Sequence, residues 1–265
     1  MLRSFFMRGR ALLVFVVYAI PGFAWGPEGH RLAARLAENL LTPAAAARVH
    51  STLAPGETIT ALSSWADEIR KTRKETEPWH FVDIPIDSAG LDMKRDCPQE
   101  NCIIGKIAEF RKRWRDETLS PAERREALLF LVHFVGDMHQ PLHCANNQDR
   151  GSNDVTVQFE GARMNLHHLW DSGLLDRMPA EEQLFTTLAH SITPDRQAAW
   201  SKGNVEIWAG ESSEAARNVV YGDLPRHQPG QIPALGETYE HDADAVVERQ
   251  LEKAAVRLAA ILNEP

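Results

Sequence analysis

The chain is short of positive charge for its size. Its 265 residues carry 29 lysines and arginines against 37 aspartates and glutamates, which gives a formal net charge of −8. This balance argues against a protein that wraps polyanions with a broad basic face. Hydrophobic residues make up 43% and charged residues 25% of the chain, so the composition is that of an ordinary globular protein and excludes a disordered one.

Cysteine is also scarce, with three in the whole chain. Cys97 and Cys102 are separated by four residues, and in an exported protein this spacing indicates a small disulfide loop. Cys144 then has no partner. We interpret it as a small buried residue rather than a nucleophile, because no further feature supports a cysteine hydrolase.

No hydrophobic run is long enough to cross a bilayer, which requires roughly 20 residues. The longest N-terminal run, 11–20, follows three arginines and precedes a segment with small residues at positions 22 and 24. This pattern predicts a signal peptide at 1–24, cleaved after Ala24, and therefore a secreted or periplasmic protein. A retained membrane anchor is the alternative. Cleavage would remove the three arginines and no acids, leaving a mature net charge of −11.

Internal repeats, low-complexity stretches and linkers are missing, and strand signals are few. One alternating segment, Val155–Phe159, leads through Glu160-Gly161 to Asn165 and predicts a short hairpin. The segments 86–102 and 221–238 are rich in turn formers and are expected to be loops. We therefore expect a mainly α fold, a single compact helical domain over 25–265 with one short β-hairpin.

Helical periodicity dominates the remainder. A capping hydroxyl followed by proline predicts three helix starts, at Thr42-Pro43, Ser120-Pro121 and Thr193-Pro194. The segment Ala127–Met138 is almost wholly apolar and predicts a central buried helix. A long amphipathic helix is expected over Ala245–Leu262.

The chemistry is concentrated in two pairs of side chains. His133 and Asp137 are four residues apart, so a helix places them on one face, and His167 and Asp171 repeat that spacing. His143 follows shortly after the first pair. Imidazole nitrogen and carboxylate oxygen are both zinc ligands, and this combination predicts a site for more than one metal ion.

A single His/Asp pair at this spacing is more often a local hydrogen bond than a metal site. Here, however, His133 and Asp137 lie inside an apolar helix. A buried carboxylate beside a buried imidazole is costly unless its charge is compensated, and a divalent cation provides that compensation. With two such pairs, metal binding becomes the better interpretation.

Three further segments complete a pattern: Trp25-Gly-Pro-Glu-Gly-His30, Ser64-Trp-Ala-Asp67-Glu-Ile-Arg70 and Trp79-His80-Phe81-Val-Asp83-Ile-Pro85. With these, the chain from Trp25 through Asp171 resembles the secreted single-strand-specific zinc nucleases of the fungal nuclease S-one/P-one type. That family shares its fold with bacterial zinc phospholipase C. The match is specific, because all the family's metal-ligand positions are present and in order.

The resemblance implies three zinc ions per chain and the residues that hold them. The first zinc would take Asp67, His80, His133 and Asp137, and the second would take His143, His167 and Asp171. The third would take the α-amino nitrogen and carbonyl oxygen of Trp25, with His30 and with Asp137 as a bridge. Three zinc ions would also supply positive charge at one place on an acidic protein.

The resemblance also implies residue roles. Asp67, Arg70 and Asp137 would be catalytic: the two zincs that share Asp137 would activate water, and Arg70 would steady transition-state charge. A surface ion pair with Asp67 or Glu68 is the alternative for Arg70.

The same likeness assigns a substrate site. Phe81 would stack on a base, Asp83 would accept from the base edge, and Asn153 would contact the substrate. Core packing is the alternative for Phe81. Ser152 stands where the family usually has a second glycine.

These features predict a secreted zinc endonuclease that cleaves single-stranded DNA or RNA to 5′-phosphate products and that also acts on 3′-nucleotides. We expect a monomer without a membrane anchor. Two alternatives stay open, a phospholipase C-type phosphodiesterase of the same fold and a non-catalytic periplasmic zinc carrier. Phe81 and Asp83, and the lack of an exposed apolar docking stretch, favour the nuclease over the lipase.

Overall fold

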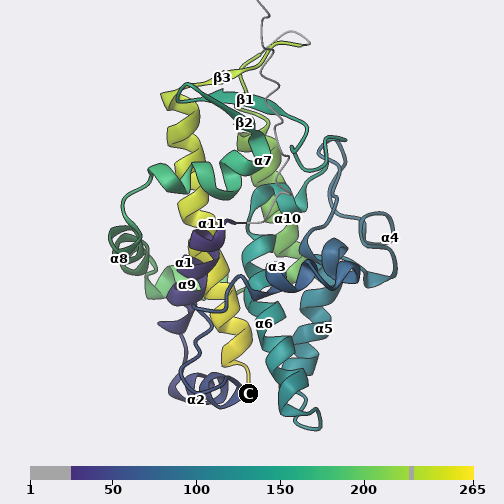
Figure 1. Ribbon diagram of the computed structural model, residues 1–265, viewed down its shortest axis with the longest axis vertical. Helices are drawn as coiled ribbons and strands as arrows, with labels where there is room; N and C mark the ends of the chain where they lie inside the picture. Colours follow the sequence, from purple (N-terminus) through teal and green to yellow (C-terminus); the bar gives the residue numbers. More distant parts are fainter. Residues whose placement is uncertain (1–24, 227–229) are drawn as a thin grey trace, which may run out of the picture.

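The structure, a computed structural model, describes residues 25–226 and 230–265, so the expected signal peptide at 1–24 lies outside the described residues. Helices make up most of the described chain, and a small sheet lies at one end of the long axis (Figure 1). The predicted mainly α class is confirmed. In the part of the chain that the structure describes, no helix has both the length and the apolar character needed to cross a bilayer.

The helical elements are α-helices of different lengths and short 3₁₀ or π turns between them. In chain order the α-helices are α1 (Pro27–Glu38), α2 (Pro43–Thr52), α3 (Trp65–Arg70), α4 (Met93–Asp96), α5 (Ile103–Arg115), α6 (Pro121–Met138), α7 (Leu166–His168), α8 (Glu181–Ser191), α9 (Pro194–Trp200), α10 (Val205–Ala215) and α11 (Glu237–Asn263). The 3₁₀ and π turns are η1 (Lys74–His80), η2 (Pro98–Glu100), η3 (Pro141–Cys144), η4 (Leu169–Gly173), η5 (Leu175–Arg177) and η6 (Ala216–Val220).

The three predicted helix starts are confirmed, and each hydroxyl caps its helix. Thr42 Oγ1 accepts from the backbone N–H of the third helical residue of α2, and Thr193 does the same for α9. Ser120 and Glu123 form a reciprocal capping box at the start of α6. These bonds satisfy amide donors that have no partner within the helix, so the start of each helix could be located from local sequence.

Helix α6 is the centre of the core. Every residue from Ala127 to Met138 is buried, as the apolar run predicted. Helices α5, α1 and α11 all pack against α6, and α11 runs along most of the long axis beside α1 (Figure 1). Because α6 is enclosed on all sides, any polar side chain that it carries must find its partners inside the protein.

The sheet is larger than predicted. The expected hairpin is present as β1 (Thr156–Phe159) and β2 (Ala162–Asn165), paired antiparallel. A third strand, β3 (Ala234–Leu235), pairs parallel with the other edge of β1. Two residues cannot display an alternating pattern, so the strand had no signal in the sequence.

The two expected loops are therefore only partly irregular. The segment 221–238 contains β3 and the first two residues of α11, and the segment 86–102 contains α4 and η2. Helix α11 begins after Gly236, before the predicted start at Ala245, because Gly236 offers no capping side chain that would mark the helix start in the sequence.

Candidate metal centre

Eight histidine and aspartate side chains from seven elements converge beside α6, which α1 and α3 flank (Figure 1). All eight are buried. They form three groups whose donor atoms lie within 4.8 Å of one another: His30, His133 and Asp137; Asp67, His80 and His133; His143, His167 and Asp171. The structure thus brings together the eight side chains that the sequence suggested as metal ligands.

Asp137, on α6, lies at the centre of the first two groups. Its Oδ2 is 2.9 Å from His80 Nδ1 and 3.3 Å from His133 Nε2, and its Oδ1 is 3.1 Å from His30 Nε2. Asp67 adds a second carboxylate, 3.7 Å from His133 Nε2. One carboxylate surrounded by three imidazoles is the arrangement expected of a bridging ligand.

His30 reaches this group because α6 carries no side chain at Gly136. A Cβ atom built there would lie 2.7 Å from His30 Nδ1. The His30 ring instead stacks on His133, with ring centroids 4.0 Å apart. The glycine next to Asp137 therefore creates the space for a ligand from α1.

The second pair is built differently from the first. His167 lies on the three-residue helix α7, and the chain then continues as the π-helical turn η4, which carries Asp171. His167 Nε2 is nonetheless 3.3 Å from Asp171 Oδ2. Turns of this kind are uncommon and occur often at functional sites. His168, the next residue on α7, is exposed and does not belong to the group.

Backbone carbonyl groups fix the orientation of three imidazoles. His133 Nδ1 lies 2.8 Å from Ser63 O, His143 Nδ1 lies 2.7 Å from His80 O, and His167 Nδ1 lies 2.6 Å from Gly151 O. Each contact places the proton on Nδ1, because a carbonyl can only accept. The Nε2 lone pair is then directed at the cluster, as in protein zinc sites.

Burial and the two carboxylates act in opposite directions on the imidazoles. Burial lowers the pKa of His30 and His80, and it lowers the pKa of His143 to about 3. Burial alone would raise the pKa of Asp137, but His133, His30 and His80 hold it well below its usual range. Burial alone would also lower the pKa of His133, but the charges of Asp137 and Asp67 raise it to about 9. The two carboxylates therefore draw positive charge to His133, the role that a divalent cation at this centre would fill.

Several donor atoms lack a hydrogen-bond partner among the described residues. They include Nε2 of His30, His133 and His143, and Oδ1 of Asp137. A buried polar atom without a partner is costly, and a cluster of lone pairs aimed at one region calls for a cation. Neutral imidazole with carboxylate is a donor set that zinc favours, so these residues fit zinc.

Trp25 and Arg70 complete the surroundings. Trp25 is fully buried, and the N–H of the next residue donates to Asp171 O at 2.7 Å, which ties the start of the described chain to the second group. Arg70 Nη2 lies 3.2 Å from Asp67 Oδ1, so the ion pair foreseen as an alternative is present. The pair is mostly shielded from solvent and adjoins the cluster.

The expected substrate residues are more open. Phe81 is half-buried and Asp83 is exposed. Desolvation, and after it the charge of Asp96, raises the pKa of Asp83. Asn153 is half-buried, and its Nδ2 donates to Arg150 O at 2.9 Å. Among the described residues, no hydrogen bond joins Asn153 to Phe81 or Asp83.

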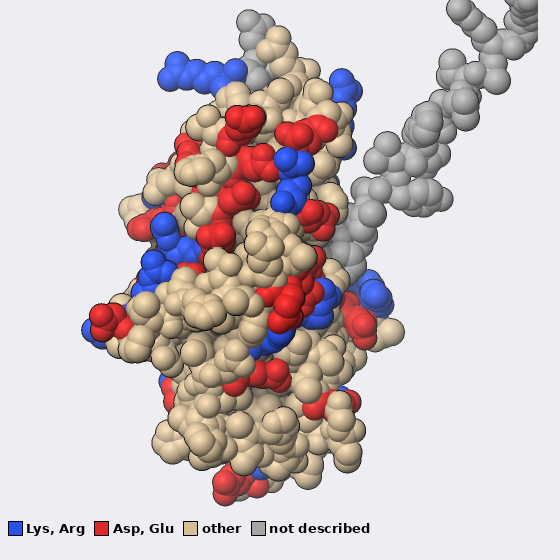
Figure 2. Space-filling view, turned by 90° about the vertical axis from the view of Figure 1, so that its left-hand side faces the viewer, with Lys and Arg blue, Asp and Glu red and all other residues tan. Residues whose placement is uncertain are grey.

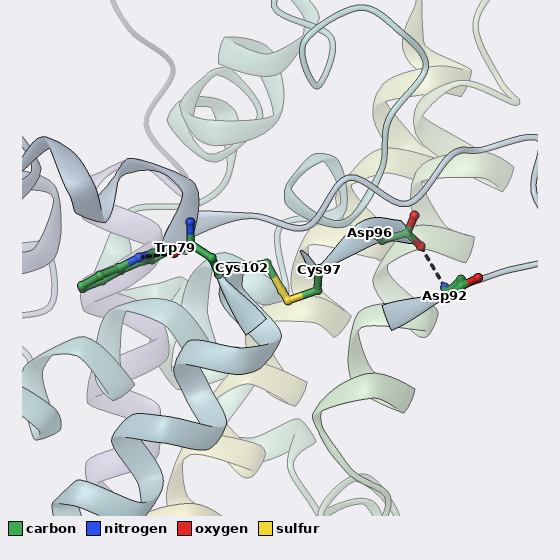
Figure 3. The surroundings of a disulfide bond; sticks show 6 residues. Trp79, Asp92, Asp96, Cys97 and Cys102 are labelled. Carbon is green, nitrogen blue, oxygen red and sulfur yellow. Dashed lines mark hydrogen bonds between the residues drawn. A yellow bond between two sulfur atoms is a disulfide. The ribbon is translucent and has the colours of Figure 1, made fainter. Parts of the chain in front are cut away.

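A disulfide joins Cys97 to Cys102, as predicted, and leaves Cys144 free and buried. Figure 3 shows the disulfide between α4 and the start of α5, next to Trp79. The backbone N–H of Ile103 donates to Phe81 O at 3.1 Å. The disulfide loop thus supports the segment that carries Phe81 and Asp83.

The face of the molecule shown in Figure 2 carries charges of both signs. On the side that carries α8, acidic and basic side chains are interspersed and no continuous basic stripe is seen (Figure 2). Two ion pairs join α1 to α8 there, Arg31 with Glu181 and Arg35 with Glu182. This agrees with the interpretation that the net charge disfavours binding over a broad basic face.

Two contributors to the centre had no signal in the sequence. Gly136 makes room for His30, as described above. Gln140 is fully buried, and its Nε2 donates to Asp171 Oδ1 at 2.6 Å while its Oε1 accepts from Leu142 N. Both lie within the His133–His143 segment, but their roles depend on residues far along the chain.

Comparison with known proteins agrees with this geometry. The family model described as S1/P1 Nuclease matches residues 25–265. Nuclease P1 of Penicillium citrinum is 32% identical over 266 residues, which cover 91% of this chain and 97% of that protein. Endonuclease 2 of Arabidopsis thaliana is 29% identical over 280 residues, covering 95% and 94%, and Nuclease S1 of Aspergillus oryzae is 28% identical over 266 residues, covering 91% of each. With the match extending over the whole described part and the buried His/Asp centre at its core, the chain belongs to the S1/P1 nuclease family.

Proposed function

We propose that this S1/P1-family nuclease is a secreted zinc-dependent endonuclease that cleaves single-stranded DNA or RNA to 5′-phosphate products and also hydrolyses 3′-nucleotides. The observation that carries the proposal is the buried centre around Asp137, in which three imidazoles surround one carboxylate. Such a centre has no evident structural purpose in a core that is otherwise apolar.

The donor groups divide into three sets, one for each proposed zinc ion. Asp67, His80, His133 and Asp137 form the first set, and His143, His167 and Asp171 the second. The third consists of His30, Asp137 and the amino and carbonyl groups of Trp25. The Trp25 nitrogen becomes a donor only after the peptide bond to Ala24 is cleaved, because an amide nitrogen shares its lone pair with the carbonyl.

When bound, zinc lowers the pKa of water and polarises phosphate oxygens. The protein groups prepare this chemistry. His133, His143 and His167 keep their protons on Nδ1, which is bonded to a backbone carbonyl, and so present Nε2 as a donor. Asp137 remains ionised, and Gln140 orients Asp171.

Arg70 is the group that acts on substrate charge. Its guanidinium lies beside Asp67 at the edge of the centre and is largely buried, with 15% of its side chain exposed. A fixed guanidinium near a phosphodiester stabilises the charge that develops on the oxygens in the transition state. Asp67 holds the guanidinium in place, so the observed ion pair and the catalytic role are compatible.

The substrate groups favour a nucleobase over a lipid headgroup. Phe81 offers a half-buried ring on which a base can stack, and stacking tolerates any base. Asp83 is an exposed acceptor two residues further along, suited to the amino groups of a base edge. Stacking requires an unpaired base, and this supports single-strand preference.

The decisive experiment is a digest of homopolymer RNA and single-stranded DNA with end-group analysis, run beside phosphatidylcholine vesicles and a 3′-nucleotide. We expect zinc-dependent cleavage of the polymers with 5′-phosphate ends and no release of phosphocholine. Hydrolysis of the lipid alone would make the protein a phospholipase C-type enzyme. Tight zinc binding without hydrolysis of any substrate would make it a carrier.

A further inference from the structure

Three consecutive residues before Asn153 adopt left-handed backbone conformations. The φ angles are 55° at Arg150, 62° at Gly151 and 67° at Ser152. Only glycine adopts this conformation without a steric cost, and the other two carry a Cβ that opposes it. Contacts elsewhere in the protein must therefore hold this loop in place.

The contacts that hold the loop come from Tyr221 and Asp149. Ser152 Oγ donates to the Tyr221 hydroxyl at 2.7 Å, and that hydroxyl donates to the Asp149 carboxylate, 3.0 Å from Oδ2. Asp149 Oδ1 accepts from the backbone N–H of Ser152 at 2.8 Å. These bonds form a closed ring of three side chains, in which Ser152 and Asp149 are buried.

The held loop faces the second metal group. Gly151 O accepts from His167 Nδ1 at 2.6 Å. A Cβ at Gly151 would lie 3.2 Å from Leu142 O and 3.5 Å from His167 Nδ1, so the loop backbone is in close contact with both. The position of one carbonyl group therefore sets the tautomer and the direction of a zinc ligand.

We propose that Tyr221, acting with Ser152 and Asp149, is a positioning residue for His167 and thereby sets the affinity of the second zinc site. This inference rests on the proposed function, since it assumes zinc at His143, His167 and Asp171. Ser152 carries a Cβ that opposes its φ of 67°, a cost that a glycine at this position would not have. The Ser152 hydroxyl forms a hydrogen bond with Tyr221 that compensates for the strained backbone of Ser152. A second glycine at this position would adopt the same backbone conformation without such a bond.

The placement of Tyr221 supports this role. It follows directly after the π-helical turn η6, and Arg217 within that turn donates to Ile86 O at 2.6 Å. Turns of this kind are rare and occur frequently at functional sites. Burial raises the pKa of Tyr221, so the phenol keeps the proton that it donates to Asp149.

The test measures zinc, not only turnover. Tyr221→Phe removes the hydroxyl that Asp149 and Ser152 share. We expect the zinc at His143, His167 and Asp171 to be released to a chelator about 10-fold more readily, the lower end of the range for groups that orient metal ligands. The other two zinc ions and the unfolding midpoint of the zinc-free protein should change little. Asp154→Asn, which removes the exposed ion pair with Arg150 from the same loop, is the matched control and should leave zinc release unchanged.

Two comparisons separate positioning from a general structural role. In a His167→Ala background, Tyr221→Phe should have no further effect, because the ligand that it positions is gone. Ser152→Ala should weaken the same zinc, since it keeps the strained φ and loses the bond, whereas Ser152→Gly should bind zinc as the wild type does. Equal weakening by both Ser152 variants, or an additive effect of Tyr221→Phe in the His167→Ala background, would overturn the inference.

The experiment distinguishes a failure of the proposed function from a failure of the positioning role of Tyr221. If the wild-type protein holds no zinc that depends on His167, the proposed function and the positioning role both fall. If the wild type holds that zinc and Tyr221→Phe releases it no faster, only the positioning role falls. Loss of all zinc ions together, with a lower unfolding midpoint of the zinc-free protein, would make Tyr221 a purely structural residue.

Discussion

Gly136 shows how one missing side chain can admit a metal ligand. Alanine at this helical position would normally favour the helix by about 1 kcal/mol. Here its Cβ would fall 2.7 Å from His30 Nδ1, closer than such contacts occur. We expect Gly136→Ala to fold, to lose about one zinc per chain and to lose most of its activity, as measured by metal analysis and hydrolysis of single-stranded DNA.

The matched control for this substitution is Gly210 in α10. A Cβ there would meet no heavy atom of the described chain within 4 Å. Gly210→Ala should therefore keep all bound zinc and raise the free energy of unfolding by about 0.5–1 kcal/mol. Full zinc content in Gly136→Ala would show that His30 can move without leaving the metal site.

Arg70 tests the catalytic part of the centre separately from its metal content. Arg70→Ala should lower kcat by ~10²–10³, the cost of losing one donor that stabilises transition-state charge. Zinc content should not change, because guanidinium is not a zinc ligand. Loss of zinc in this variant would mean that Arg70 only holds Asp67 in place. Arg73→Ala, which breaks partly exposed ion pairs with Glu75 and Glu126, is a suitable control.

At the scale of a single element, α11 carries like charges around the half-buried Asp244. Burial raises the pKa of Asp244 to about 6, and Glu240 and Glu248, one turn away on either side, add to the shift. Its Oδ1 has no hydrogen-bond partner among the described residues. The folded pKa lies above the unfolded one, so the contribution of the neutral carboxyl is complete below pH ~4 and is lost as the pH rises through about 6.

Asp244→Asn should therefore stabilise the protein at pH 8 and make little difference at pH 4. We expect a gain below about 1 kcal/mol at the higher pH, because solvent screens a partly exposed group. Denaturant titrations of both proteins at several pH values measure the difference. A stability difference that is equal at pH 4 and pH 8 would contradict the assignment.

The number of reactive thiols per chain tests the disulfide between Cys97 and Cys102. Cys144 is fully buried, its thiol donates to Met138 O, and burial raises its pKa, so it should not react in the native protein. We expect no labelled thiol per chain before denaturation and one after it without reductant. Three labelled thiols after denaturation would refute the disulfide in the isolated protein.

Reduction of the Cys97–Cys102 disulfide should also change the free energy of unfolding. Because the loop is short, its opening should lower the free energy of unfolding by only about 2 kcal/mol on the chain-entropy estimate. The reduced protein should keep its zinc, since no metal donor lies in the loop.

At the scale of the whole molecule, we expect zinc binding to stabilise the folded core. We expect that removing zinc would leave two buried carboxyl groups, Asp137 and Asp171, and several buried imidazole nitrogens without the cations that they would bind. Each site filled at a free zinc concentration 1,000 times its Kd contributes about 4 kcal/mol, which in a domain of this size corresponds to a shift in Tm on the order of 10 °C.

We expect chelation to lower Tm by at least this much while far-ultraviolet circular dichroism at 25 °C stays helical, because α6 remains packed on α5, α1 and α11. Zinc should restore Tm and magnesium should not, since imidazole nitrogen is a poor ligand for magnesium. An unchanged Tm after complete zinc removal would show that the buried centre is stable without cations.

Local sequence determined the elements whose signals are local. The capping groups at Thr42, Ser120 and Thr193 and the apolar run of α6 each fixed a helix within a few residues. The spacing of His133 and Asp137 fixed their shared face, because a regular helix relates positions four apart.

The tertiary structure decided the features that depend on contacts between segments far apart in the sequence. The strand β3 exists because the chain returns to β1, and two residues carry no pattern of their own. His30 reaches the centre because Gly136 leaves space on a helix a hundred residues further along the chain. Gly151, Ser152 and Tyr221 come together across about seventy residues. The sequence period indicates which face of a helix a residue occupies, whereas only packing brings two faces together. The group of His143, His167 and Asp171 is assembled by such packing.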